Sequence, residues 1–522
     1  MKVALIALGN FRSSAVHLLH ALLERDGFDV RSFLFKAAAF RATPQEIELL
    51  SNLVREHEPK LIGISFLSTF YKLACTVTQT LRELSDATII WGGVHPTVRP
   101  EDCLKHADIV CVGEGEEAML ELAHTLRSQP TERIHPIRNL WFKTSGELIR
   151  NDVRPLLQDL DSLPIPYYLS ERKRFIEANR ILDLHAHADM VEAYDTMTSR
   201  GCPFACDYCI NCFLRSLYRD KGRYIRKRSV GHVIDELRLA RERYPNLQTI
   251  SFTDDIFALD QQWLEEFHDR YRREIGLLFF CYVHPNMVRD STIKMLRDCG
   301  LRYVIMGIQS GSARVREQFL GRRTPKERIL QSARTLRKYR VRVAYDFIAD
   351  NPYETDDDRR DTLELIAQFP RPFQLHLFSI GMFPGARLTE RALHDGVIRV
   401  EDIECMSEKG YDLFAGSLHL ARDDNLLKWD VLYFLAKRGI PLRALAALSR
   451  SRSFAKHVRL TAKILRCLPI DYYGFVTYLV QNRLNFLVWR LFTYGRILAR
   501  GDWRFLFKKI GHRILRVEDA HL

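Results

Sequence analysis

Short apolar strands alternate with amphipathic helices twice along the 522-residue chain, and this alternation most restricts the possible folds. The strand candidates of the first stretch are 2–8, 29–35, 61–67, 87–93 and 107–113. Strands of this length separated by helices with a period near 3.6 predict a doubly wound, parallel α/β sheet. We assign this domain to residues 1–140, and we expect a ligand to bind beyond the carboxyl ends of its strands.

Small or polar residues follow four of these strands and would line one edge of the sheet. The candidates are Gly9, Ser65, Ser68, Thr69, Gly92, Gly93, His95, Gly113 and Glu114. The alternative is that these residues form ordinary strand-to-helix turns, which need glycine in any case.

The alternation resumes over residues 191–400 after a stretch, 141–190, whose prolines and mixed charges predict an irregular linker. The strand candidates here are 192–199, 248–254, 277–283, 302–308, 343–349 and 374–380. Six strand–helix units in series predict a parallel barrel, complete or partial, with chemistry at the carboxyl ends of its strands. Residues 401–522 lose the strand pattern and are expected to be helical.

Three cysteines, Cys202, Cys206 and Cys209, directly follow the first strand of the second stretch. Eleven cysteines in a long chain without a secretion signal favour a reducing cytoplasm, where clustered thiols bind metals. Cys212 adds a further CxxC pair, so a zinc knuckle is one candidate, but a closed zinc site needs four protein ligands. Three cysteines on a four-iron cluster instead leave one iron open to another molecule.

The segment CPFACDYC, which contains the three cysteines, resembles the cluster motif of the radical S-adenosylmethionine (SAM) enzymes. Four later segments look like motifs of that superfamily, in the same order, over about 190 residues: FTDDIF, GIQSGS, DFIADNPYET and FPGARL. Near the N-terminus, WGGVHPTVRPED and VCVGEGEEAMLEL resemble the cobalamin-binding domain that precedes this barrel in one large subclass. The DxHxxG motif of classical cobalamin enzymes does not occur, so a histidine ligand on cobalt is not expected.

The resemblance implies a [4Fe-4S] cluster on Cys202, Cys206 and Cys209, SAM on its open iron, and cobalamin on the loop residues named above. The residues that it implies for SAM are Tyr208, Asp254, Asp255, Gln309, Ser310, Arg323, Ile348 and Glu354. Alternatives remain for several of them: the two aspartates also suit helix caps, and Arg323 also suits a solvated face. The basic run 223–229 either contacts SAM or the cobalamin phosphate or is a solvated loop, and Cys212 is expected to be a free thiol.

The reaction that the resemblance favours is methylation of an unactivated carbon in a small-molecule or lipophilic substrate. It implies an external electron donor of the flavodoxin or ferredoxin type. One alternative is a radical rearrangement or an oxidative cyclisation, as in anaerobic tetrapyrrole ring formation. A second alternative is a non-catalytic cobalamin or iron–sulfur sensor with a nucleic-acid-binding tail.

The C-terminal region carries the basic charge of the chain. Residues 437–522 contain 18 Lys and Arg against four Asp and Glu, about +14, whereas the whole chain carries +13. Its aromatic and apolar residues follow a helical spacing, which suits a lid over the barrel or an amphipathic surface on an anionic membrane. Nucleic-acid binding is the least favoured interpretation. We therefore expect a cytoplasmic protein, with peripheral contact to the inner face of the membrane as one interpretation of the tail.

Overall fold

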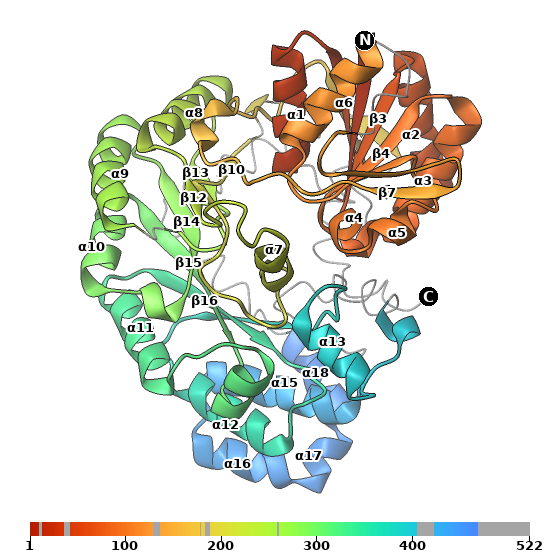
Figure 1. Cartoon of the computed structure of the whole chain (residues 1–522). Helices are drawn as coiled ribbons and strands as arrows, with labels where there is room; N and C mark the ends of the chain where they lie inside the picture. Colours follow the sequence, from red (N-terminus) through yellow and green to blue (C-terminus); the bar gives the residue numbers. More distant parts are fainter. Residues whose placement is uncertain are drawn as a thin grey trace, which may run out of the picture. The chain divides into compact units, whose positions relative to one another are not determined.

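The computed structural model describes residues 1–9, 13–35, 42–128, 136–177, 179–182, 188–189, 191–257, 260–403 and 422–467. The chain divides into a large unit, Met1–Arg459, and a small unit, Leu460–Leu522. The large unit contains a nine-stranded mixed sheet and a six-stranded parallel sheet with helices around them (Figure 1). None of the helices described is long and apolar enough to cross a bilayer.

The N-terminal sheet is built on five parallel strands in the order β5-β4-β3-β1-β2, as the sequence predicts. They are β1 (Lys2–Leu8), β2 (Asp29–Phe35), β3 (Leu61–Ser65), β4 (Thr88–Gly92) and β5 (Ile109–Cys111). Strand β1 lies at the centre between β2 and β3, and helices cover both faces, which explains why its residues 3–8 are all apolar and buried. The helices are α1 (Ser14–Arg25), α2 (Pro44–His57), α3 (Tyr71–Leu84), α4 (Val94–Val98), α5 (Pro100–Cys103) and α6 (Glu116–Ser128).

The stretch expected to be an irregular linker instead extends this sheet at both edges. The hairpin β6 (Leu140–Thr144) and β7 (Glu147–Arg150) adds to β5, and the hairpin β8 (Lys173–Glu177) and β9 (Arg180–Leu182) adds to β2. These strands are polar on one side because they lie at the sheet edges, so they lack the apolar runs that reveal the central strands. The prediction of an irregular linker is therefore wrong for both ends of 141–190, whereas residues 151–172 contain no strand and only one helical turn, Leu160–Ser162, as expected.

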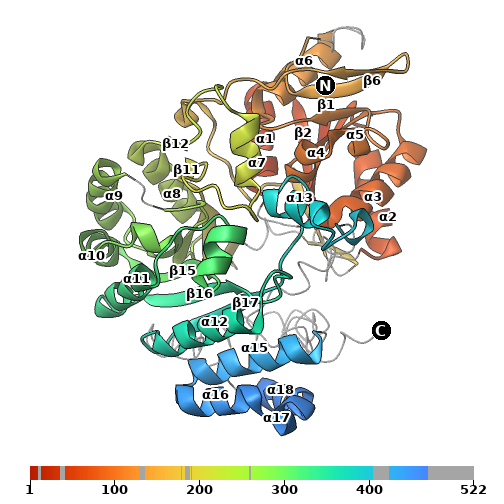
Figure 2. The ribbon, with the colours of Figure 1, turned by 60° about the horizontal axis from the view of Figure 1, so that its bottom comes forward.

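The second sheet has six parallel strands in sequence order, which confirms the partial (β/α)6 barrel. They are β10 (Ala193–Thr196), β13 (Thr249–Phe252), β14 (Leu278–Val283), β15 (Leu301–Gln309), β16 (Arg342–Ile348) and β17 (Gln374–Phe378). Its helices are α7 (Asn211–Leu217), α8 (Val230–Arg243), α9 (Gln261–Glu274), α10 (Asp290–Cys299), α11 (Lys326–Lys338), α12 (Asp356–Gln368) and α13 (Arg387–His394). Helices α8 to α12 follow one another along the outer side of the sheet (Figures 1 and 2).

The helical C-terminal region begins with α15 (Asp424–Lys437), which packs on α12 of the barrel. Its Trp429 is buried and donates from Nε1 to Asp356 Oδ1 at 3.0 Å, so this helix belongs to the core of the large unit. Three shorter helices follow: α16 (Leu442–Arg450), α17 (Arg452–Lys456) and α18 (Val458–Cys467). The predicted helices at the start of the tail are confirmed, and those after 467 lie outside the described residues.

Candidate functional site

The three cysteines lie on the loop between a two-residue strand, β11 (Ser199–Arg200), and helix α7. All three are free thiols; the Cys209 amide donates to the Cys206 carbonyl at 3.1 Å, and Asn211 Nδ2 lies 3.6 Å from Cys209 Sγ. Burial, with added repulsion from Asp255 and the other two cysteines, raises the pKa of Cys202 to about 12. These thiols are therefore close enough to interact, and the Cys202 thiol needs a strong positive charge, such as that of iron, to ionise at neutral pH.

No group of three His, Cys, Asp or Glu side chains in the described part of the chain is gathered around one metal-ion position. The donor chemistry of the loop nevertheless fits a [4Fe-4S] cluster, in which each thiolate binds a different iron. Cys202, Cys206 and Cys209 are the residues that would hold it. Cys212 is buried at the start of α7, and its sulfur lies 3.9 Å from the Gly385 carbonyl.

His284, at the end of β14, provides a second observation that favours a bound group beside this loop. Its ring stacks on Phe204, between the first two cysteines, with 3.7 Å between ring centroids. Its Nδ1 accepts from the Asn286 amide at 3.1 Å, whereas Nε2 is buried without a partner among the described residues. Burial, reinforced by Arg322 and Arg328, lowers the pKa of His284 to about 2. The ring is therefore neutral and keeps an unused N–H donor beside the cysteine loop.

An arginine does reach the cysteine loop, but it is not the one that the sequence predicted. Arg323 is exposed, whereas its neighbour Arg322 is buried and lies 3.7 Å from Cys206 Sγ. Arg322 also lies 3.4 Å from the Tyr208 hydroxyl and donates to the Gly307 carbonyl at 2.5 Å. The arginine next to the candidate cluster is thus Arg322.

The other residues predicted for SAM divide between the carboxyl ends of the strands and the structural interior. Ser310 donates to Glu354 Oε1 at 2.9 Å, and burial raises the pKa of that carboxyl to about 7. Gln309, at the end of β15, adopts a left-handed φ of 74°, which is uncommon for a residue other than glycine. Ile348 ends β16 in an apolar cluster on which Tyr208 packs. These residues surround the carboxyl ends of β15 and β16, as predicted.

The two aspartates after β13 have different surroundings. The Asp254 carboxylate is 1% exposed and accepts from the Thr198 amide at 3.0 Å, from its hydroxyl at 2.7 Å and from the Ser199 hydroxyl at 2.5 Å. It therefore fixes the segment before the cysteine loop, and it does not line the cavity that Asp255 lines. Asp255 lines a cavity, and burial raises the pKa of its carboxyl.

That cavity has a volume of about 530 Å³ and lies between the carboxyl edge of the N-terminal sheet and the barrel. Five of the residues predicted for cobalamin line it: Ser65, Gly92, Gly93, Gly113 and Glu114. Across the cavity, Gly201, Asn211 and Asp255 belong to the surroundings of the cysteine loop. A molecule held on the sheet edge would therefore face that loop.

Two of the glycines at this edge are required by close contacts. A Cβ on Gly93 would lie 2.7 Å from the Phe66 carbonyl oxygen, and one on Gly113 would lie 2.0 Å from the Tyr218 hydroxyl. Both residues also have positive φ, 101° and 87°, which disfavours any other residue.

Four residues predicted for cobalamin do not line the cavity: Gly9, Ser68, Thr69 and His95. His95 is buried against the rings of Tyr71 and Phe66, at centroid distances of 4.6 and 5.8 Å. Neither ring nitrogen has a partner in the described part of the chain, and burial lowers the pKa of His95 to about 4. The structure therefore places His95 in an aromatic cluster and not at the cavity, where the sequence predicted it.

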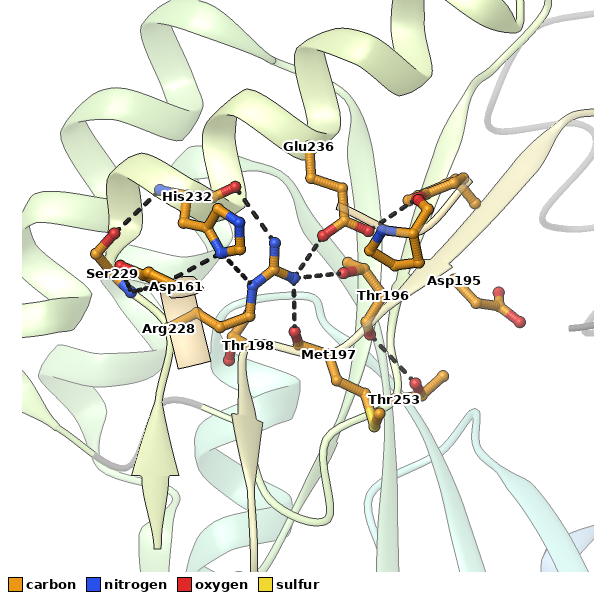
Figure 3. A network of polar contacts seen from close by, with 12 residues as sticks. Asp161, Asp195, Thr196, Met197, Thr198, Arg228, Ser229, His232, Glu236 and Thr253 are labelled. Carbon is orange, nitrogen blue, oxygen red and sulfur yellow. Dashed lines mark hydrogen bonds and ion pairs between the residues drawn. The ribbon is translucent and has the colours of Figure 1, made fainter. Parts of the chain in front are cut away.

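Three arginines line the cavity, and the sequence pointed only to the basic run that contains two of them. Arg200 pairs with Glu116 at 2.6 Å, Arg226 pairs with Glu114 at 2.6 Å, and Arg228 forms an ion pair with Glu236. Figure 3 shows Arg228 between Glu236, His232 and the end of β10. The run is thus neither a solvated loop nor an unpaired anion site. Arg226 and Arg228 are two residues apart, and in an extended segment this spacing places both side chains on the same side, which the sequence alone could have indicated.

Comparisons with known proteins agree with this architecture. Residues 7–123 match the family model of the B12 binding domain, and residues 196–366 match that of the radical SAM superfamily. The chain is 26% identical over 358 residues to an uncharacterised methyltransferase of Pyrococcus horikoshii, covering 67% of this chain and 72% of that protein. It is 23% identical over 308 residues to the anaerobic magnesium-protoporphyrin IX monomethyl ester cyclase of Synechocystis, covering 57% of each.

A solved structure shares the fold. The radical SAM methyltransferase TsrM of Kitasatospora setae, determined with cobalamin and a [4Fe-4S] cluster bound, superposes with a TM-score of 0.63. The two chains are 17% identical, and the match covers 89% of this chain and 98% of that one.

Proposed function

Because the chain belongs to the radical SAM enzymes that carry an N-terminal B12-binding domain, we propose that it methylates an unactivated carbon of its substrate. Its cofactors are a [4Fe-4S] cluster, SAM and cobalamin. When bound, they supply a radical that removes hydrogen from carbon and a methyl group that replaces it. The contribution of the protein is to hold these groups in fixed positions relative to the substrate and to exclude water.

The observation that carries this proposal is the cavity shared by the two domains. Its sheet edge offers glycines for close backbone approach, and its opposite wall belongs to the cysteine loop and Asp255. Such a cavity suits a cobalamin that faces a cluster-bound SAM, with Ser310, Glu354 and Ile348 at the strand ends as candidate SAM contacts. An external one-electron donor would complete the reaction.

The test is anaerobic reconstitution with iron, sulfide and cobalamin, followed by assay with methyl-deuterated SAM and a one-electron reductant such as dithionite, against panels of small and lipophilic substrates. We expect formation of deoxyadenosine and a product that carries the labelled methyl group. The Cys206→Ala variant, prepared in the same way, should give neither. Deoxyadenosine without methylated product across the panel would argue against this assignment.

A second candidate reaction is oxidative cyclisation or rearrangement, and the similarity to the cyclase of Synechocystis favours it. The same assay distinguishes the two reactions. A product that has lost hydrogen or been rearranged, with no labelled methyl group, would support cyclisation or rearrangement.

A further inference from the structure

A short two-stranded antiparallel ribbon, called the hairpin below, forms the base of the cysteine loop. Strand β11 pairs antiparallel with β12 (Arg226–Lys227), so that Arg200 lies opposite Arg226 and Ser199 opposite Lys227. Arg200 is only two residues before Cys202. Any contact that moves this hairpin therefore also moves the first cysteine.

Arg228, directly after β12, fixes the hairpin to the barrel (Figure 3). Its guanidinium donates to the Met197 carbonyl at 3.0 Å and to His232 Nδ1 at 3.1 Å, and it forms an ion pair with Glu236, whose side chain is 1% exposed. Tyr194 of β10 donates to the same Glu236 carboxylate at 2.8 Å. This side of the hairpin is thus held by buried charges that all belong to the barrel.

Arg226 fixes the hairpin to the other domain. Its two terminal nitrogens donate to the two oxygens of Glu114 at 2.8 and 2.6 Å, and Arg200 lies 3.3 Å from the same carboxylate. The Arg226 side chain is 4% exposed and that of Glu114 is 26% exposed, and both line the cavity, so water in the cavity still reaches the carboxylate. Burial opposes ionisation of Glu114, but the two arginines outweigh it and lower the pKa of the carboxyl.

The position of Glu114 connects this contact to the cavity. It follows β5 on the loop whose Gly113 amide donates to the Thr97 hydroxyl at 3.0 Å, and its own amide donates to the Tyr218 hydroxyl at 2.6 Å. Both carboxylate oxygens are occupied by Arg226, so Glu114 has little capacity left to hold a cofactor directly.

We propose that Glu114 is a positioning residue, which couples occupation of the cavity by cobalamin to the position of the cysteine loop. A ligand that fills the cavity expels water from around Glu114, Arg226 and Arg200, and a lower dielectric strengthens their attraction. By thermodynamic linkage, the intact ion pair then raises the affinity for that ligand by the same factor by which the bound ligand strengthens the ion pair. This inference rests on the proposed use of cobalamin, and it replaces the prediction that Glu114 contacts cobalamin itself.

The test is a double-mutant cycle with Glu114→Gln, Arg226→Gln and the double variant, in the full chain with its cluster reconstituted. Cobalamin affinity is measured by absorbance titration, and the magnetic coupling between cob(II)alamin and the reduced cluster by electron paramagnetic resonance. We expect each single variant to weaken binding roughly tenfold, and the double variant to be no weaker than either. The magnetic coupling should change in all three. Glu101→Gln is the control, because it removes an exposed ion pair with Arg150 of 2.6 Å on the same domain.

Each other outcome contradicts the inference. Additive losses would mean that Glu114 contacts cobalamin independently of Arg226, and unchanged affinity with unchanged magnetic coupling would mean that the ion pair does not position the loop. A wild-type protein that binds no cobalamin would contradict the proposed function itself. Glu114→Asp and Arg226→Lys retain both charges but lose the two-pronged geometry, and they replace the neutral variants if those do not fold.

Discussion

The guanidinium of Arg322 lies 3.7 Å from the sulfur of Cys206, on the buried side of the cysteine loop. A positively charged donor at a cluster thiolate stabilises the reduced, more negative state of the cluster. Arg322 thus suits control of the reduction potential, a role that the exposed Arg323 cannot share.

Replacing Arg322 by Gln should shift the midpoint potential of the cluster to more negative values, because a full positive charge is lost beside Cys206. Potentiometric titration followed by electron paramagnetic resonance measures this shift. Arg323→Gln is the matched control and should leave the potential unchanged. Equal potentials in the two variants would show that Arg322 does not act on the cluster.

Replacing Cys202, Cys206 or Cys209 by Ala should remove the iron–sulfur absorbance and the cleavage of SAM, because each is the proposed ligand of one iron. Cys212→Ala should retain both, since that thiol is buried against the Gly385 carbonyl. Iron content and deoxyadenosine yield measure the result. A Cys212 variant without a cluster would contradict the assignment of ligands.

Glu354 gives a pH-dependent contribution to stability. Burial raises its pKa from 4.5 to about 7, so the folded protein binds this proton more tightly than the unfolded chain. The contribution is therefore present below pH 4.5 and is lost as the pH rises through 7. Glu354→Gln lacks this contribution. The free energy of unfolding of Glu354→Gln minus that of wild type, measured by urea unfolding, should therefore be roughly 3 kcal/mol higher at pH 8 than at pH 4.5.

Two comparisons separate the contribution of Glu354 from those of other carboxyl groups. Asp357→Asn is the control, because this side chain lies three residues after Glu354, in the first turn of α12, and is 85% exposed; it should not change the pH dependence. Asp430, whose pKa burial raises to about 7, contributes with the same sign, so Glu354→Gln should reduce the slope between these pH values without abolishing it. An unchanged slope in Glu354→Gln would contradict this account.

Under the membrane interpretation of the C-terminal tail, its positive charge and apolar side chains bind an anionic membrane; under the lid interpretation they do not. Each Lys or Arg near such a surface contributes about 1 kcal/mol, and salt weakens this attraction. A protein that ends at residue 467 keeps the buried helix α15 and removes only the last part of the tail. The full chain should float with anionic liposomes more than this shortened protein, and neutral liposomes should bind both weakly. Equal flotation of the two proteins would leave the lid interpretation in place.

The sequence predicted the central strands of the N-terminal sheet because residues such as those of β1 are buried on two sides and therefore form continuous apolar runs. The barrel strands, whose burial alternates as in β14 and β15, were predicted because short strand-like segments alternate with amphipathic helices. It did not predict β6 to β9, since edge strands such as Glu147–Arg150 are half polar. Which of Arg322 and Arg323 reaches the cysteine loop depends on the turn after residues 315–319, and no local sequence periodicity predicts that turn. The partner of Arg226 is 112 residues away in sequence, so only the fold could reveal it.

The paired arginines of the cavity have a consequence for what the cavity can recognise. Arg200, Arg226 and Arg228 each pair with a carboxylate that also lines the cavity, so these three pairs add little net charge to the space that they border. Ionic strength should then have little influence on how tightly that space is filled, because buried pairs are only weakly screened. Selectivity is instead a matter of shape and apolar contact. Exchanging apolar wall residues such as Leu160, Leu163 and Met197 should therefore alter what fills this space more than adding charge would.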